Sequence, residues 1–286
     1  MRTEIITSAQ NPKIKNLLLL QEKSKARREQ GLFVVEGRRE LEHCREAGFT
    51  IRTLFVCPSI FGDIDSAENY FLCSCPKNQF PAESQSVLRH PTHSEAPSII
   101  EIPEALYRKV AYRESTEGII AEVEYKSLKL KDLQLPENPL IMVLESVEKP
   151  GNLGAVLRSA DAAGVDTVIF CDPLTDLYNP NLIRASIGAV FTVPTVLASS
   201  QEAIAFLQER GIQILTAQLQ DSSLYYDVDM RRGTALVMGT EATGLTDLWR
   251  KAASAHIRIP MLGRLDSLNV SVSAAILLFE AVRQRQ

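Results

Sequence analysis

The sequence lacks the features that mark secreted and membrane-spanning proteins. No uninterrupted apolar run approaches the roughly 20 residues that a membrane-spanning helix requires. The N-terminus, M-R-T-E-I-I-T-S-A-Q, has no apolar stretch of signal-peptide length and carries an early Glu4. We therefore expect a cytoplasmic protein with no membrane partner.

Cysteine and histidine are scarce as well, and their spacing favours no metal site. The chain has 5 cysteines and 4 histidines. Cys73-Ser-Cys75 has the form of half a metal site, but no pair of cysteines or histidines with zinc-like spacing follows it. We expect structural or reduced free cysteines and no bound metal, and the role of the Cys73/Cys75 pair stays open.

The net charge of −4 does not by itself indicate a nucleic-acid-binding protein. Residues 1–30, however, hold seven lysines and arginines against three glutamates, a local excess of four positive charges (seven minus three). Such a segment attracts a phosphate backbone, with an affinity that depends on salt. The alternative is a solvated helix face. The basic residues are Arg2, Lys13, Lys15, Lys23, Lys25, Arg27 and Arg28.

What the sequence does contain is typical of a globular protein of about two domains. It has 286 residues, of which 45% are hydrophobic and 23% charged. Periodicity and helix- or strand-ending residues identify the elements of the first half. They predict helices over 11–28, 37–47 and 103–110, and strands over 32–35, 51–56 and 118–123.

The second half alternates short, continuously apolar strands with helices. This pattern is typical of a parallel sheet that is covered on both faces. The predicted fold class is therefore α/β, with a parallel-sheet domain over 139–286, a smaller α/β domain over 1–125 and a proline-ended linker over 126–138. Strands are expected over 140–144, 167–170, 212–215, 235–238 and 256–259, and helices up to 164, over 201–210 and over 269–283.

The first of three notable loops follows the strand over 140–144. Pro150 and Gly151 form a turn, Asn152 is a possible helix cap, and the helix ends at Gly164. Arg158 lies about 140° round this helix from its apolar face. A surface arginine is one interpretation of this residue. The loop lacks the G-x-G-x-x-G spacing of a dinucleotide site.

The second and third loops also follow predicted strands. One strand ends at Gly239, and glycines there let a ligand approach the backbone; Glu241 beside it is a cap, a solvated acid or a functional group. The other strand ends at Ile259, and Ser267 or Asn269 caps the last helix. That helix is apolar nearly all round, so it lies either at the centre of its domain or in a subunit interface.

These loops together resemble the motifs of the SpoU-type (TrmH-like) branch of the SPOUT RNA methyltransferases. The resemblance spans 140–286, in the family's order. Its motifs are P-G-N-L-G-A-V-L-R-S-A-D-A-A-G, M-G-T-E-A-T-G-L and I-P-M-L-G-R-L-D-S-L-N-V-S-V-S. A segment between motifs, D-L-Y-N-P-N-L-I-R-A-S-I-G-A-V-F, also looks like the family. Upstream, L-F-V-V-E-G-R-R-E-L and S-T-E-G-I-I-A are similar to its small N-terminal domain.

The resemblance implies a trefoil-knotted C-terminal domain, a homodimer and S-adenosylmethionine as methyl donor. It implies that residues 1–125 are an RNA substrate-binding domain related to a ribosomal-protein fold. By motif position, the expected cofactor-binding residues are Gly239, Ile259, Leu268, Met238 and Met261. The expected catalytic residues are Arg158, Asn152, Glu241, Ser267 and Asn269.

The reaction implied is methylation of a ribose 2′-hydroxyl in RNA, with ribosomal RNA favoured as the substrate. Because an arginine stays protonated below about pH 12, we expect Arg158 to stabilise the developing oxyanion or to orient a phosphate; a general-base role is the alternative. Other candidate functions are a transfer-RNA 2′-O-methyltransferase, a base methyltransferase with the same fold, and a catalytically silent RNA-binding or ribosome-assembly factor.

Overall fold

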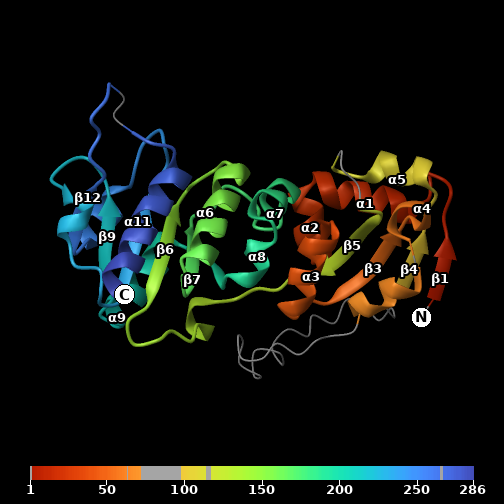
Figure 1. Cartoon of the computed structure of the whole chain (residues 1–286), viewed down its shortest axis with the longest axis horizontal. Coiled ribbons are helices and arrows are strands. Elements are labelled where there is room, and N and C mark those ends of the chain that lie inside the picture. The colour runs from red at the N-terminus through yellow and green to blue at the C-terminus, as the bar shows by residue number, and fades with distance from the viewer. Residues whose placement is uncertain (1, 63, 72–97, 114–116, 265–266) are drawn as a thin grey trace. The chain divides into compact units, whose positions relative to one another are not determined.

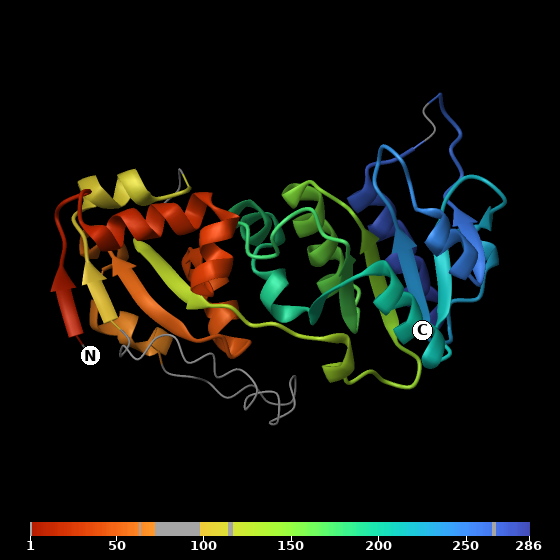
Figure 2. The same ribbon diagram turned by 180° about the vertical axis from the view of Figure 1, so that it is seen from behind.

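In the computed structural model the chain divides into two compact units, each with its own sheet (Figures 1 and 2). No helix among the described residues is long and apolar enough to cross a membrane. Residues 73 and 75 lie outside the described part of the chain. The described residues are 2–62, 64–71, 98–113, 117–264 and 267–286. Unit 1 comprises Met1–Lys126 and Leu177–Thr192, and unit 2 comprises Ser127–Asp176 and Val193–Gln286.

Unit 1 is built on a mixed five-stranded sheet. The first three strands in its order are parallel, and the strand next to them, β5, runs antiparallel to both of its neighbours. The sheet order is β1 (Arg2–Ile5), β4 (Ser98–Glu101), β3 (Ile51–Val56), β5 (Ile119–Glu124) and β2 (Leu32–Glu36). Its helices are α1 (Pro12–Glu22), α2 (Ser24–Gln30), α3 (Arg38–Glu46), α4 (Pro58–Phe61), α5 (Glu104–Val110), α7 (Pro180–Ser186) and α8 (Ala189–Thr192), with the 3₁₀ helix η1 (Ile64–Phe71).

The basic N-terminal segment contributes apolar side chains and one arginine to the interior of unit 1. The single helix expected over 11–28 is two helices, because Lys23 has extended backbone angles. Ile14 and Leu17 of α1 are fully buried. Arg27 is only 1% exposed, and its Nη1 donates hydrogen bonds to the carbonyls of Leu20 (2.7 Å) and Gln21 (3.1 Å) at the end of α1. Arg27 is therefore structural, and contact of this segment with RNA has to be tested by point substitutions.

The segment Leu177–Thr192 joins unit 1 through aromatic packing. Tyr178 stacks on Phe33 of β2, with 4.1 Å between ring centroids, and its hydroxyl donates to the carbonyl of Lys126 (2.6 Å). Phe191 packs edge-on against Phe49. This segment lies within 139–286, the range expected as one domain, yet it belongs to unit 1. Its contacts with residues far away in the sequence are the reason. The expected domain boundaries themselves stay a prediction.

Unit 2 contains a seven-stranded sheet in which every strand pair is parallel. This confirms the predicted α/β class with a parallel sheet, whereas the trefoil knot stays a prediction. The short edge strands β8 and β10 were not expected. The sheet order is β10 (Ser223–Leu224), β12 (Ala255–Arg258), β9 (Gln213–Ala217), β11 (Thr234–Met238), β6 (Leu140–Glu145), β7 (Thr167–Cys171) and β8 (Thr195–Ala198).

Helices cover this sheet and bury its apolar side chains. The core on one face joins Ile141 and Val143 to side chains of α9 and α10. Leucines of the expected linker pack against this same core, so that stretch is part of unit 2. Helix α11 packs against α6 and β11. The elements are α6 (Pro150–Ala162), α9 (Ser200–Glu209), α10 (Asp247–Ala252), α11 (Val270–Arg285) and the 3₁₀ helices η3 (Leu130–Asp132) and η4 (Tyr225–Asp227).

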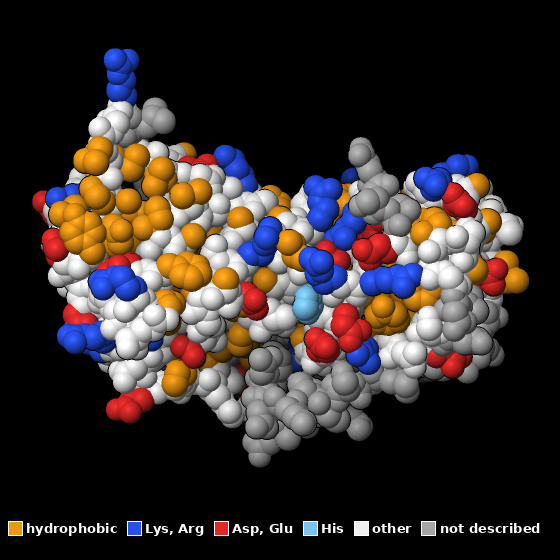
Figure 3. Space-filling view, in the orientation of Figure 1, with side chains coloured by type: hydrophobic (Ala, Val, Ile, Leu, Met, Phe, Trp, Pro, Cys, Tyr) orange, Lys and Arg blue, Asp and Glu red, His pale blue; other side chains and the backbone are white. Residues whose placement is uncertain are grey.

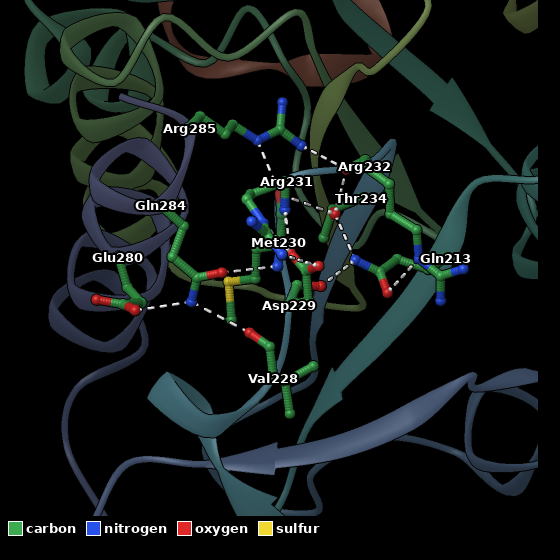
Figure 4. A network of polar contacts seen from close by, with 10 residues as sticks. All are labelled: Gln213, Val228, Asp229, Met230, Arg231, Arg232, Thr234, Glu280, Gln284 and Arg285. Atoms are coloured by element: carbon green, nitrogen blue, oxygen red, sulfur yellow. Dashed lines mark hydrogen bonds and ion pairs between the residues drawn. The ribbon is translucent and has the colours of Figure 1, made fainter.

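The end of α11 is held by a polar network with the loop before β11 (Figure 4). The Arg285 guanidinium donates to four backbone carbonyls, including those of Met230 (2.9 Å), Arg232 (2.8 Å) and Asn138 (2.8 Å). The Gln284 side chain accepts from the Met230 amide at 2.8 Å. These bonds tie the last helix to the strand at the centre of the sheet.

We expect Arg285→Ala to lower the free energy of unfolding by about 2 kcal/mol, because carbonyls bonded to a charged donor lose their partner. Arg283→Ala is the matched control. Arg283 is largely exposed and pairs with Glu280, so its loss should cost less than about 1 kcal/mol. Urea unfolding of both variants is the measurement, and equal losses would contradict the structural role of Arg285.

Candidate active site

A pocket of about 400 Å³ opens at the carboxyl ends of β9, β11 and β12. Parallel strands bring their following loops to one edge of the sheet, which is where α/β proteins bind ligands. The walls come from the ends of these strands, the loops after them and the first turns of α11. The residues that line it are Ala217, Gln218, Leu219, Gln220, Met238, Gly239, Thr240, Glu241, Ala242, Thr243, Gly244, Arg250, Ile257, Arg258, Ile259, Met261, Ser267, Leu268, Val270, Ser273 and Leu277.

All five residues expected to bind the cofactor line this pocket: Met238, Gly239, Ile259, Met261 and Leu268. Apolar side chains and accessible backbone suit a flat purine ring and its ribose, and the volume lies in the usual range of ligand sites, about 300–1,000 Å³. The site therefore fits S-adenosylmethionine. The role of these five residues in cofactor binding stays a prediction.

The loop after β11 has a tight backbone that only glycine permits. A Cβ on Gly239 would lie 2.2 Å from the carbonyl oxygen of Gly244, far inside van der Waals contact. Gly244 has φ +68°. The amide of Gly244 donates to the Thr240 carbonyl (3.0 Å), and the Thr240 and Thr243 hydroxyls lie 2.8 Å apart. The helix after this loop, α10, begins at Asp247.

Three of the expected catalytic side chains meet beside the pocket. Glu241 Oε1 accepts from Asn152 Nδ2 (3.0 Å) and from Asn269 Nδ2 (2.9 Å). Asn269 also donates to Asn152 Oδ1 at 3.2 Å. The Asn269 oxygen accepts from the Ser271 amide and so caps α11, as predicted. Asn152 lies inside α6 and caps nothing; its amide side chain belongs to this network instead.

Lys149 is a member of this network that the sequence did not single out. Its Nζ lies 2.8 Å from Glu241 Oε2. Lys149 is the N-cap residue of α6, where the helix dipole disfavours a cation unless a carboxylate lies close. That conflict was the only signal for it in the sequence. The hydrogen bond from Lys149 lowers the pKa of Glu241, and the same contact raises the pKa of Lys149.

The remaining two expected catalytic residues lie outside the network. Ser267 is exposed and lines the pocket. Arg158 is exposed on α6. It lies six residues beyond Asn152, about 9 Å along the helix and about 120° round it. The structure therefore does not bring Arg158 to the carboxylate, and its side chain is available to a ligand outside this network.

A parallel sheet with this pocket and a carboxylate–amide network at its carboxyl edge is typical of enzymes that bind a nucleotide-like cofactor. The model of the SpoU rRNA Methylase family matches residues 139–279, and that of the MRM3-like substrate binding domain matches residues 11–121.

Relatives cover most of the chain. The 23S rRNA (guanosine-2′-O-)-methyltransferase RlmB of Bordetella pertussis is 39% identical over 59% of this chain and 71% of its own length. A crystal structure described as an RNA 2′-O ribose methyltransferase is 36% identical, with a TM-score of 0.76, and covers 98% of this chain and 99% of its own. The AdoMet-bound rRNA methyltransferase of Sinorhizobium meliloti is 28% identical, with a TM-score of 0.82, and covers 98% of each chain.

The chain belongs to the SpoU rRNA methylase family. This confirms the expected family and the expected enzyme class, an RNA ribose 2′-O-methyltransferase. It also confirms S-adenosylmethionine as the methyl donor.

We expect Lys149→Met to raise the pKa of Glu241 towards its ordinary value, because the hydrogen bond from Lys149 is the largest cause that lowers it. The pKa is read from the pH titration of the carboxyl carbon by nuclear magnetic resonance. Lys131→Met, at an exposed lysine of η3, is the control and should leave the titration of Glu241 unchanged. An unshifted Glu241 in Lys149→Met would show that the ion pair is absent in solution.

Proposed function

We propose that this protein methylates the ribose 2′-hydroxyl of a guanosine in 23S ribosomal RNA. The observation that carries the proposal is the convergence of three loops, which places the Asn152–Glu241–Asn269 network beside a pocket that fits S-adenosylmethionine. The substrate follows the relatives that are named as 23S rRNA guanosine-2′-O-methyltransferases. Because those relatives are bacterial enzymes of ribosomal RNA, the proposal includes a cytoplasmic location.

The side chains of the site act on the acceptor ribose. Bound S-adenosylmethionine supplies a methyl group on a sulfonium sulfur. Methylation of the 2′-oxygen would release the hydroxyl proton to water, and negative charge would develop on that oxygen. The Arg158 guanidinium stays protonated and stabilises that charge, or it orients the adjacent phosphate. Action of a neutral Arg158 as general base is the alternative mechanism.

The network holds the ribose in register. The pKa of Glu241 is lowered, so its carboxylate is ionised at neutral pH and accepts hydrogen bonds from both asparagine amides. The second N–H of Asn152 and the Ser267 hydroxyl at the pocket wall are placed to contact the sugar. Positioning of this kind holds the bound cofactor and the acceptor hydroxyl in a near-attack arrangement.

Unit 1 supplies RNA binding in this proposal. Support comes from the substrate-binding-domain model, which matches residues 11–121. Of the basic residues in the N-terminal segment, Lys13 pairs with Glu4, Lys25 pairs with Glu29 and Arg27 is buried. Among those whose side chains the structure describes, Lys15, Lys23 and Arg28 are exposed and remain to contact phosphates.

We expect Arg158→Ala to lower kcat about 100-fold, the cost of removing one donor to a developing oxyanion. Arg158→Lys should recover little, because a lysine lacks the bidentate fork. The assay follows labelled methyl from S-adenosylmethionine into 23S rRNA that lacks the modification, with nucleoside mass spectrometry. Arg231→Ala, at an exposed arginine paired with Asp229, is the control and should keep the wild-type rate.

Four results would overturn the proposal or one of its parts. Full transfer by Arg158→Ala would remove that residue from the reaction. Methyl found on a base would change the reaction class. Transfer only to transfer RNA would change the substrate, and no transfer by wild-type protein that binds the cofactor would indicate an RNA-binding factor.

The proposal includes a homodimer that buries one face of α11. Val272 and Phe279 lie seven residues apart on one face of the helix and are 46% and 48% exposed. Figure 3 shows hydrophobic side chains gathered over this part of unit 2. An apolar stripe of this kind on a helix is typical of a subunit contact.

We expect Phe279→Arg to convert the dimer to a monomer, because a charge would replace an apolar group at the centre of the contact. Light scattering after size-exclusion chromatography measures the mass. Arg283→Ala, one turn further along α11, is the matched control and should stay dimeric. A wild-type protein that is monomeric at micromolar concentration would contradict the proposed assembly.

A further inference from the structure

A second carboxylate, Glu145, lies buried behind the pocket. It is the last residue of β6 and is only 3% exposed. Leu144 pairs with Met238 in the sheet, so Glu145 lies next to the point where β11 passes into the loop over 239–246. The rest of β6 is Leu, Ile, Met and Val.

Two of the hydrogen bonds that Glu145 accepts come from the far end of that loop. Its Oε2 accepts from the backbone amide of Thr246 (2.9 Å), and its Oε1 accepts from the Thr246 hydroxyl (2.7 Å). Thr246 is the N-cap residue of α10, yet its hydroxyl caps no amide of that helix. The hydroxyl that ordinarily caps a helix is bonded to Glu145 instead.

The Ser200 hydroxyl also connects Glu145 to the neighbouring loops. Ser200 Oγ lies 3.3 Å from Glu145 Oε1 and 2.6 Å from Asp172 Oδ2, and it accepts from the Trp249 indole at 3.0 Å. The end of β6, the loop after β7 and the starts of α9 and α10 therefore meet at one polar cluster, in which Glu145 and Ser200 are buried and Asp172 and Thr246 are exposed.

A buried carboxylate with only neutral donors is expensive, since desolvation costs several kcal/mol and an apolar residue of similar size would avoid it. No cation offsets that cost, because no lysine or arginine among the described residues forms a salt bridge with Glu145. The carboxylate instead fixes the position of the loop. It fixes Thr246, while pairing of β11 fixes Met238, so both ends of the stretch that carries Gly239 and Glu241 are held.

We propose that Glu145 is a positioning residue for the cofactor site, which acts through Thr246 to hold the 239–245 loop in its binding shape. This inference rests on the proposed function, because it takes the pocket as the S-adenosylmethionine site. Leu245, 4% exposed, packs in the core beside Trp249 and adds an apolar anchor at the same end of the loop. Without Glu145 the loop keeps that anchor but loses the two directed bonds at Thr246.

The test is binding of S-adenosylhomocysteine, measured by calorimetry without RNA, together with steady-state kinetics. Glu145→Ala should raise the cofactor Kd and KM about tenfold, since small displacements at a binding site cost that much or more, while kcat at saturating cofactor changes little. Glu145→Gln keeps a carbonyl oxygen for the Thr246 amide and should restore most of the affinity. Thr246→Val removes one of the two bonds and should give an intermediate loss.

Glu280→Gln is the matched control. Glu280 is also a buried carboxylate of unit 2, but it lies in the second half of α11 and bonds Arg283 and Gln284. It should lower the melting temperature and leave the cofactor Kd unchanged. If Glu145→Ala and Thr246→Val bind S-adenosylhomocysteine as the wild type does, the inference is overturned, even where their melting temperatures fall.

The design separates this inference from the proposed function. Wild-type protein that binds no S-adenosyl compound, or that binds it and transfers no methyl to RNA, would overturn the function. Wild-type protein that does both, beside a Glu145→Ala variant with unchanged affinity, would overturn only the role of Glu145. If Glu145→Ala does not fold, Thr246→Val is the variant that tests the inference. It retains the Glu145 carboxylate and the hydrogen bond from the backbone amide at position 246.

Discussion

Parallel pairing of β11 with both β6 and β9 is the interaction on which the site depends. Because these strands point the same way, the loops that follow them emerge at one edge of the sheet. Asn152 and Asn269, which are 117 positions apart in sequence, are thereby brought within 3.2 Å. The polar network that ties Arg285 and Gln284 to the loop before β11 secures the same strand from its other end.

Two carboxylates at this edge of the sheet have different surroundings. Glu241 is held at the surface by Lys149 and two asparagines. Glu145 is buried and bonds only to neutral donors that belong to the framework behind the pocket. The pocket beside Glu241 is lined by apolar side chains that suit a purine, such as Met238 and Ile259, and by polar and charged ones, such as Arg250 and Arg258.

Local sequence patterns predicted most of the strands and the loops that gather at the site. They predicted fewer of the contacts that hold these elements in place. The apolar run at Leu140–Glu145 and the glycines after β11 are local signals, and they placed the loops correctly. Their chemical roles came from the resemblance to a family and not from spacing. Burial of Arg27 and the packing of Tyr178 on Phe33 depend on contacts between segments far apart in sequence, so no local pattern reveals them. Two-residue β10 is shorter than any periodicity can detect.

The most direct test of this account is a crystal structure of the protein with S-adenosylhomocysteine. The account predicts the purine and ribose against Met238–Gly239, Ile259 and Leu268, with the Glu241 network intact beside the sulfur. Ligand found elsewhere in unit 2, or a loop over 239–245 rearranged so that Glu241 leaves Asn152 and Asn269, would contradict it.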